Sequence, residues 1–257
     1  MVTLVSGTFR KASPQTDPDF FAVEAAGLRW LAAAGPDAAQ VVGVVEVSAA
    51  QIVLQRLQSV RPTPAAAEAF GRALWNTHTA GAAAFGQPPD GWTGDGYIGQ
   101  QRMTMTPAPT WGRFFAEQRV LPYAHQARDR GNLSAAGAAA VDRVSNRLVA
   151  GEFDDDAPPA RIHGDLWAGN VLFTSDGVVL IDPAAHGGHG LTDLAMLHLF
   201  GAPHLDLITA AYAEAASLAS GWPELIGLHQ LHPLLVHAVS HGASYGAEAA
   251  RIAARYG

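Results

Sequence analysis

The segment His163-Gly-Asp-Leu-Trp-Ala-Gly-Asn170 contains an aspartate and an asparagine five positions apart, Asp165 and Asn170. A second aspartate, Asp182, follows Asn170 by twelve positions. A carboxylate can accept the proton of an attacking hydroxyl, and an amide oxygen together with a second carboxylate can ligate Mg²⁺. This spacing is typical of a kinase catalytic loop that is followed by a metal-binding aspartate. We therefore predict that Asp165 is the catalytic base and that Asn170 and Asp182 hold Mg²⁺.

A hairpin between Asn170 and Asp182 would bring these two residues together. The apolar runs Val171–Phe173 and Val178–Ile181 flank Ser175-Asp176-Gly177, and Asp-Gly between alternating apolar runs is a strong hairpin signal. The alternative interpretation is that the three polar residues only cap turns and end a strand.

Lys11 is the only lysine of the chain, and the other fifteen basic residues are arginines. Arginine cannot replace lysine where a compact ammonium must fit a confined anion site. Lys11 lies on the predicted strand Thr8–Lys11, where it could bind the α- and β-phosphates of ATP. Glu24, on a helix predicted from about Phe20 to Ala33, could hold Lys11 as an ion pair. The alternatives are an exposed edge-strand lysine and a solvated glutamate.

The nucleotide base needs a third element, which we place after the predicted strand Ile52–Leu54. The residues Gln55-Arg56-Leu57 that follow would form a hinge, with the backbone of Gln55 and Leu57 holding adenine. Since backbone groups would make these contacts, the side chains there carry little information.

The elements around these residues divide the chain into two parts. Pro62 and Pro64 mark the boundary, so we predict a nucleotide-binding lobe over residues 1–60 and a catalytic and substrate lobe over residues 61–257. The first lobe would contain two strand pairs, Val2–Val5 with Thr8–Lys11 and Val41–Val47 with Gln51–Leu57.

The second part is expected to be mostly helical. Predicted helices cover Ala65–Gly81, Trp111–Leu121, Ser134–Val149 and most of the chain from Thr192 onward, while Gly86–Pro109 and Glu152–Pro159 are expected to be loops. Strands followed by helices, rather than a regular alternation, indicate an α+β bilobal protein-kinase-like fold.

Composition narrows the function classes. With 257 residues, 49% hydrophobic and 15% charged, the chain can bury a globular core. The absence of cysteine excludes disulfides and thiolate chemistry, and the net charge of −7 argues against nucleic-acid binding. No apolar run is long enough to span a membrane, and the N-terminal residues do not look like a signal peptide, so we expect a cytoplasmic protein. Oligomeric state is not indicated.

These motifs closely resemble those of the fructosamine kinase (ketosamine 3-kinase) family, which is related to aminoglycoside and choline kinases. The Asp-Pro-Ala that begins at Asp182, and Trp167 after His-Gly-Asp-Leu, favour this family over its relatives. The matching segments are His163–Asn170, Ile181–His189, Thr192–Leu197 and Phe200-Gly201, with outlying matches at Phe85-Gly86, Tyr97–Gly99, Trp111, Phe114-Phe115 and Leu228–His237.

The resemblance implies ATP- and Mg²⁺-dependent phosphorylation of the sugar 3-hydroxyl of ketosamines, which are glycation adducts on small amines or protein lysines. The 3-phosphate is unstable and releases the amine, so the activity would be a deglycation repair. The resemblance also implies that Trp167 lines the sugar pocket, although a core aromatic is an equal alternative. For His186 and His189 the alternatives are substrate contact and a satisfied loop histidine. Asp193 and His163 would brace the catalytic loop.

Only ten residues precede Lys11, whereas the family carries a first strand and a loop over the phosphates before this lysine. The resemblance therefore predicts a truncated N-terminal lobe. Three other functions remain open: a kinase for another small alcohol such as an aminoglycoside or amino alcohol, a degenerate non-catalytic binding module, and a metal-dependent hydrolase using Asp165. A hydrolase would need neither the hinge nor Lys11.

Overall fold

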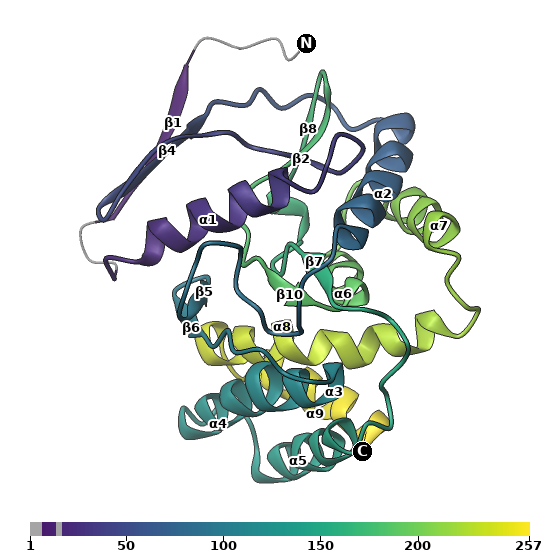
Figure 1. Cartoon of the computed structure of the whole chain (residues 1–257). Coiled ribbons are helices and arrows are strands. Elements are labelled where there is room, and N and C mark those ends of the chain that lie inside the picture. The colour runs from purple at the N-terminus through teal and green to yellow at the C-terminus, as the bar shows by residue number, and fades with distance from the viewer. Residues whose placement is uncertain (1–6, 14–16) are drawn as a thin grey trace.

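The computed structural model describes residues 7–13 and 17–257. A small part built on strands packs against a larger helical part (Figure 1). The expected strand Val2–Val5 lies outside the described residues, and with it the expectation of a truncated lobe.

The small part contains an antiparallel sheet with the strand order β1-β4-β3. Its strands are β1 (Thr8–Ala12), β3 (Val44–Ser48) and β4 (Gln51–Gln55). Helix α1 (Phe20–Ala32) covers one face of this sheet, because its apolar side chains recur at helical spacing. The shared core is formed by Phe21, Ala25, Leu28, Val42, Ile52, Leu54 and Val179.

The expected single strand Val41–Val47 is wrong, because Val41 belongs to a different sheet. Gln40 and Val41 form the short strand β2, which pairs in parallel with β9 (Gly177–Leu180), Val41 opposite Leu180. Strand β9 also pairs with β8 (Val171–Thr174) as the predicted Asp-Gly hairpin. The small part therefore shares a sheet with the segment that leads to Asp182. The division at residue 60 stays a prediction.

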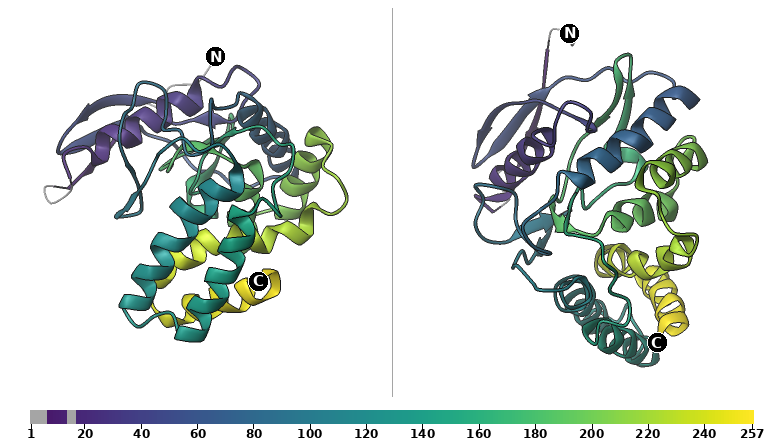
Figure 2. Two further views of the ribbon diagram at one scale, coloured as in Figure 1. Left: turned by 60° about the horizontal axis from the view of Figure 1, so that its bottom comes forward. Right: turned by 45° about the vertical axis from the view of Figure 1, so that its right-hand side comes forward.

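Helices dominate the rest of the chain, as expected. They are α2 (Pro64–Thr79), α3 (Trp111–Phe114), the π-helical turn η1 (Phe115–Val120), α4 (Leu121–Asp129), α5 (Ala135–Val149), α6 (Gly190–Phe200), α7 (Leu205–Ala216), the 3₁₀ turn η3 (Trp222–Leu225), α8 (Ile226–His241) and α9 (Ala243–Tyr256). Thr63 and Ser134 cap α2 and α5 through their hydroxyl groups. Figure 2 shows α4 and α5 beside the C-terminal helices, with which they share a core. Within the described ranges, no helix has the length and apolar character that crossing a membrane requires.

The segment Gly86–Pro109, expected to be a loop, contains a hairpin. Its strands are β5 (Gly96–Ile98) and β6 (Gln101–Met103). Each strand is only three residues long, which is too short for an alternating pattern to be recognised in the sequence.

Two further short strands frame the catalytic segment. Strand β7 (Ala160–Ile162) pairs antiparallel with β10 (His186–Gly188). The catalytic loop leaves β7 at His163 and ends in the 3₁₀ turn η2 (Ala168–Asn170), directly before β8. The β7–β10 pair therefore fixes the start of this loop against the segment that follows Asp182.

Candidate active site

The structure brings Asp165, Asn170 and Asp182 together. The Asn170 Nδ2 donates to the backbone oxygen of Asp165 at 2.8 Å and to its Oδ2 at 3.4 Å. It also donates to the backbone oxygen of Asp182 at 3.3 Å. The β8–β9 hairpin makes this possible, because it returns the chain to Asn170 after its turn at Gly177.

Lys11 joins the same group from the small sheet. Its Nζ lies 2.8 and 2.9 Å from the two carboxylate oxygens of Glu24 and 3.0 Å from Oδ1 of Asp182. Lys11 comes from β1 and Glu24 from α1, so the strand and the helix that cover each other also position the ion pair. The geometry that we predicted for Lys11 and Glu24 is present.

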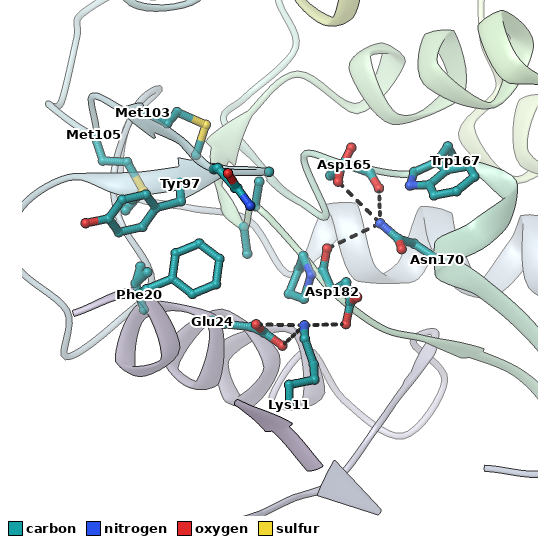
Figure 3. Close-up of a pocket in the computed structure, with 17 residues that line it drawn as sticks. Lys11, Phe20, Glu24, Tyr97, Met103, Met105, Asp165, Trp167, Asn170 and Asp182 are labelled. Carbon is teal, nitrogen blue, oxygen red and sulfur yellow. Dashed lines mark hydrogen bonds and ion pairs between the residues drawn. The ribbon is translucent and has the colours of Figure 1, made fainter. Parts of the chain in front are cut away.

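A cavity of about 360 Å³ surrounds these residues (Figure 3). Its polar lining includes all five residues just described, and Trp167 lies at its edge with 43% of its surface exposed. The remaining lining is largely apolar and comes from α1, from the β5–β6 hairpin and from the residues after Asp182. These are Phe20, Val23, Gly96, Tyr97, Gly99, Gln100, Met103, Met105, Pro183, Ala184 and Ala185.

The apolar wall of this cavity was not predicted. Figure 3 shows Phe20 and Tyr97 next to each other, with Met103 and Met105 beyond them. In the sequence, the one indication that this wall belongs to the site was Tyr97, which lies in a segment that resembles the family. The two methionines become part of the site only through packing of the hairpin.

Burial sets the protonation of the candidate base. Desolvation raises the pKa of Asp165 from 3.8 to about 6, and the Asp182 and Asp193 carboxylates act in the same direction. The hydrogen bond from Asn170 opposes this rise. A carboxyl group with this pKa is ionised at neutral pH but binds protons better than an ordinary aspartate, as suits a general base.

Burial and ion pairing act in opposite directions on Lys11. Desolvation lowers the pKa of the lysine, but the carboxylates of Glu24 and Asp182 outweigh it, so the pKa is raised above 10.5. Lys11 is therefore a permanent cation. Burial raises the pKa of Glu24, and the charge of Lys11 opposes this rise.

Two oxygen atoms of the site have the chemistry of Mg²⁺ ligands. Asp182 gives Lys11 its Oδ1, and within the described residues its Oδ2 has no hydrogen-bond partner. Asn170 uses its Nδ2 as a donor and, over the same residues, leaves its Oδ1 without a partner. A carboxylate oxygen and an amide oxygen fit an ion that takes its other ligands from phosphates and water. Asp182 has φ 53°, a strained backbone typical of functional positions.

A buried carboxylate, Asp193, holds the start of the catalytic loop. It accepts hydrogen bonds from the backbone N–H groups of His163 at 2.8 Å and Gly164 at 2.9 Å. His78 donates to it through Nε2 at 3.0 Å, and the Tyr212 hydroxyl donates to His78 Nδ1 at 2.7 Å. Burial acts to raise the pKa of Asp193, but the contacts with His78 and the charges nearby outweigh it, and the pKa is lowered. The predicted bracing role of Asp193 is confirmed.

His163 also braces the loop. Its Nδ1 accepts from the backbone N–H of Asp165 at 3.2 Å, and its Nε2 donates to the backbone oxygen of Ile181 at 2.9 Å. Burial lowers the pKa of His163, so its ring is neutral and both nitrogen atoms serve the loop.

His186 and His189 do not line the cavity. His189 caps α6, because its Nδ1 accepts from the Leu191 N–H at 3.1 Å, and its Nε2 lies 3.2 Å from Asp155 Oδ2. His186 donates from Nδ1 to the backbone oxygen of Ala184 at 2.7 Å. Both rings make contacts within the fold, His186 on β10 and His189 at the start of α6, and the substrate contact of His189 stays a prediction.

Gln55 and Leu57 line a second, adjoining cavity of about 290 Å³, which reaches Asp182. Phe9 on β1 and Leu172 on β8 belong to its apolar lining. Among the described residues, the Leu57 N–H has no hydrogen-bond acceptor. An apolar slot with a free backbone donor, open to Asp182, fits the expected adenine site.

Comparison with known sequences gives a consistent result. A family model described as fructosamine kinase matches residues 4–256. A probable ketoamine kinase of Enterococcus faecium is 28% identical over 243 residues, which are 93% of this chain and 84% of the relative. A probable ketoamine kinase of Thermus thermophilus is 30% identical over 236 residues, covering 91% of this chain and 82% of the relative.

Solved structures share the fold. The crystal structure of a candidate fructosamine-3-kinase from Thermobifida fusca is 47% identical, with a TM-score of 0.87 over 96% of this chain and 85% of that one. An aminoglycoside phosphotransferase in complex with gentamicin is only 10% identical but superimposes with a TM-score of 0.63 over 97% and 87% of the two chains. The predicted bilobal kinase-like fold is confirmed.

Proposed function

The chain belongs to the fructosamine kinase family and is an ATP-dependent phosphotransferase acting on a sugar-like alcohol, and we propose that its acceptor is the 3-hydroxyl of ketosamines. The substrates would be fructosamine or ribulosamine adducts of small amines or protein lysines. Loss of the unstable 3-phosphate would then release the amine, so the enzyme would be a deglycation kinase. We propose that it acts in the cytoplasm.

We assign the base to Asp165. Its carboxylate would accept the proton of the acceptor hydroxyl as the oxygen attacks the γ-phosphorus of ATP, and ADP would leave with the bridging oxygen. The burial that raises its pKa to about 6 supports this role. The hydrogen bond from Asn170 would fix the direction of the carboxylate.

Lys11 and the hinge would bind the nucleotide. Lys11 Nζ, held by Glu24, would contact the α- and β-phosphates. The adjoining cavity lined by Gln55 and Leu57 would take adenine, and Phe9 offers a ring to one face of the base. Mg²⁺ would be held by Asn170 and Asp182, and when bound it would neutralise developing charge on the phosphates.

The acceptor would occupy the cavity between Asp165 and the apolar wall. Its polar end contains the carboxylates of Glu24, Asp165 and Asp182 against the single ammonium of Lys11. This excess of negative charge suits a ketosamine, whose secondary amine is cationic at neutral pH. The face of Trp167 would cover the sugar.

The observation that carries the proposal is the convergence of five residues from four separate segments on one cavity. Lys11, Glu24, Asp165, Asn170 and Asp182 all line it, and each has the chemistry that phosphoryl transfer needs. A binding module without turnover would need no buried base beside the metal ligands.

Incubation with Mg·ATP and either ribulosamine-lysine or fructosamine-lysine, followed by ADP release, tests the proposal. We expect turnover that an Asp165→Asn variant lacks, and a product phosphorylated on the sugar 3-hydroxyl by NMR. An ADP signal equal to that of the variant would refute ketosamines as the acceptor. Tight Mg·ATP binding by calorimetry without turnover would indicate the degenerate binding module.

A panel with aminoglycosides, amino alcohols and ketosamines tests the acceptor class. We expect ketosamines to have the highest kcat/KM. A higher value for either other class would overturn the acceptor assignment while leaving the phosphotransferase intact.

A further inference from the structure

The start of α1 contacts the β5–β6 hairpin beside the cavity. Arg102 on β6 forms an ion pair with Asp17, three positions before α1 begins. The Arg102 guanidinium lies 5.8 Å from the centroid of the Tyr97 ring, and the rings of Tyr97 and Phe20 are 5.1 Å apart. We call these four residues, Asp17, Phe20, Tyr97 and Arg102, the α1–hairpin clasp.

Asp17 is the centre of the clasp. Its Oδ1 accepts from the backbone N–H of Asp19 at 3.2 Å, and its Oδ2 accepts from Arg102. Partial burial, together with a hydrogen bond to Asp17, raises the pKa of Tyr97 to about 12. The hydrogen bonds from the Asp19 backbone and from Tyr97 lower the pKa of Asp17, so it is ionised at neutral pH.

The hairpin side of the clasp is fixed to the helical part independently of the Arg102 side chain. The Tyr123 hydroxyl on α4 donates to the backbone oxygen of Arg102 at 3.0 Å. Gln101 donates through Nε2 to the backbone oxygen of Val236 on α8 at 3.0 Å. Substitution of the Arg102 side chain leaves both anchors in place.

The α1 side of the clasp carries the residue that holds Lys11. Phe20 and Glu24 are four positions apart on α1, so they lie on the same face of the helix. Phe20 packs on Tyr97, and Glu24 binds Lys11 one turn later. A shift of the first turn of α1 would therefore move the wall of the cavity and the ion pair of Lys11 together.

We propose that the clasp sets α1 against the helical part, so that Asp17 and Arg102 are positioning residues for phosphoryl transfer. The inference rests on the proposed function, because the two groups that it aligns are the nucleotide lysine and the acceptor wall. The ion pair is exposed, 65% at the Arg102 side chain and 28% at Asp17. Exposed pairs add little to global stability, so the loss of this one should appear in activity rather than in folding.

The test compares Arg102→Met, Arg102→Glu and Arg102→Lys with wild type, using ribulosamine-lysine and Mg·ATP. We expect the Met and Glu variants to lose about tenfold in kcat/KM, through misalignment, with Tm unchanged within about 2 °C. Arg102→Lys keeps the charge opposite Asp17 and should recover most of the activity. At high salt the gap between wild type and Arg102→Met should shrink, because exposed pairs are screened.

Arg113→Met is the matched control. Arg113 pairs with Glu117 in the helical part, with a side-chain exposure of 54% that is similar to that of Arg102. This variant should keep wild-type kcat/KM and Tm. Wild-type kinetics in Arg102→Met, or an equal loss in Arg113→Met, would overturn the proposal, as would a fall in Tm that accounts for the lost activity.

A second readout separates the clasp from the proposed function. The affinity for Mg·ATP, measured by calorimetry, depends on Lys11 and needs no acceptor. If wild type fails to turn over any ketosamine, the proposed acceptor is wrong, and the clasp is judged by whether Arg102→Glu weakens Mg·ATP binding relative to Arg113→Met. Equal affinities in those two variants would then overturn it.

Discussion

The Nζ of Lys11 lies 3.0 Å from Oδ1 of Asp182, although 171 positions separate the two residues. The same Nζ also contacts both carboxylate oxygens of Glu24. One ammonium therefore bridges β1, α1 and the end of the β8–β9 hairpin. Because Glu24 can neutralise Lys11 alone, Asp182 can turn to a metal ion without leaving the lysine unpaired.

Replacement of Lys11 by arginine should not preserve activity. The guanidinium is planar and larger than the ammonium, so it cannot occupy the point between two carboxylates that Nζ fills. We expect Lys11→Arg to lower kcat/KM for Mg·ATP by about a hundredfold, the size of effect that loss of one oxyanion-hole donor has in other enzymes. Steady-state kinetics with varied ATP measures this. Retention of wild-type kcat/KM would show that any cation serves here.

Activity should depend on the ionisation of Asp165. Since burial raises its pKa to about 6, the basic form is lost as the pH falls through that value. We expect kcat/KM for a ketosamine to decrease about tenfold per pH unit below pH 6. The pH profile from 5 to 8, with buffers of constant ionic strength, measures it. A flat profile over this range would argue against Asp165 as the base.

The charged carboxylate of Asp165 should lower the free energy of unfolding at neutral pH. The folded-state pKa of Asp165 lies above its ordinary value of 3.8. Stability linked to this group is therefore fully present below pH 3.8 and is lost as the pH rises through about 6. We expect Asp165→Asn to be inactive but more stable than wild type by about 2 kcal/mol at pH 7.5. Urea unfolding at pH 7.5 and at pH 4 measures this, and the difference should vanish at the lower pH.

The buried contacts of Asp193, which hold the start of the catalytic loop, should contribute strongly to the free energy of unfolding. Asp193 is fully buried and accepts from two loop amides and from His78. We expect His78→Ala to destabilise the protein by about 3 kcal/mol, because it leaves a buried carboxylate without its ring partner. Tyr212→Phe removes only the outer hydrogen bond to His78 and should cost about 1 kcal/mol. Urea denaturation of both variants tests the order of these effects, and equal losses would contradict it.

Phe9 should contribute to nucleotide binding without contributing to the core. It lines the slot next to Gln55 and Leu57, yet half of its surface is exposed. We expect Phe9→Ala to weaken Mg·ATP binding about fivefold, through loss of stacking on the base. Binding of Mg·tripolyphosphate, which has no base, should be unchanged. Calorimetry with both ligands tests this prediction. Equal weakening of Mg·ATP and Mg·tripolyphosphate binding would show that Phe9 does not contact the base.

The clustering of Asp165, Asn170 and Asp182 could be predicted because these residues lie on strong local signals. The Asp-Gly turn at Asp176 predicted the hairpin that brings Asp182 to Asn170, and this hairpin is present. The contact between His189 and Asp155 could not be predicted in this way, because the two residues are 34 positions apart and no local pattern links them.

Two other differences between the expected and the observed strands have the same physical origin. Val41 continues an apolar run, and only its pairing with Leu180 shows that it belongs to another sheet. The β5–β6 hairpin has three-residue strands in a segment rich in glycine and proline, and its anchors are contacts of Gln101 and Arg102 with distant helices. Tertiary contacts determine both strand assignments, so the local sequence pattern could not predict them.

The pairing of β2 with β9 has a mechanical consequence. It attaches the small part of the molecule to the β8–β9 hairpin near the C-terminal end of α1, whereas the clasp attaches the N-terminal end of the helix. Helix α1 has 13 residues and is therefore about 20 Å long. The helix is therefore held at both ends, and Glu24, which binds Lys11, lies between the two points of attachment.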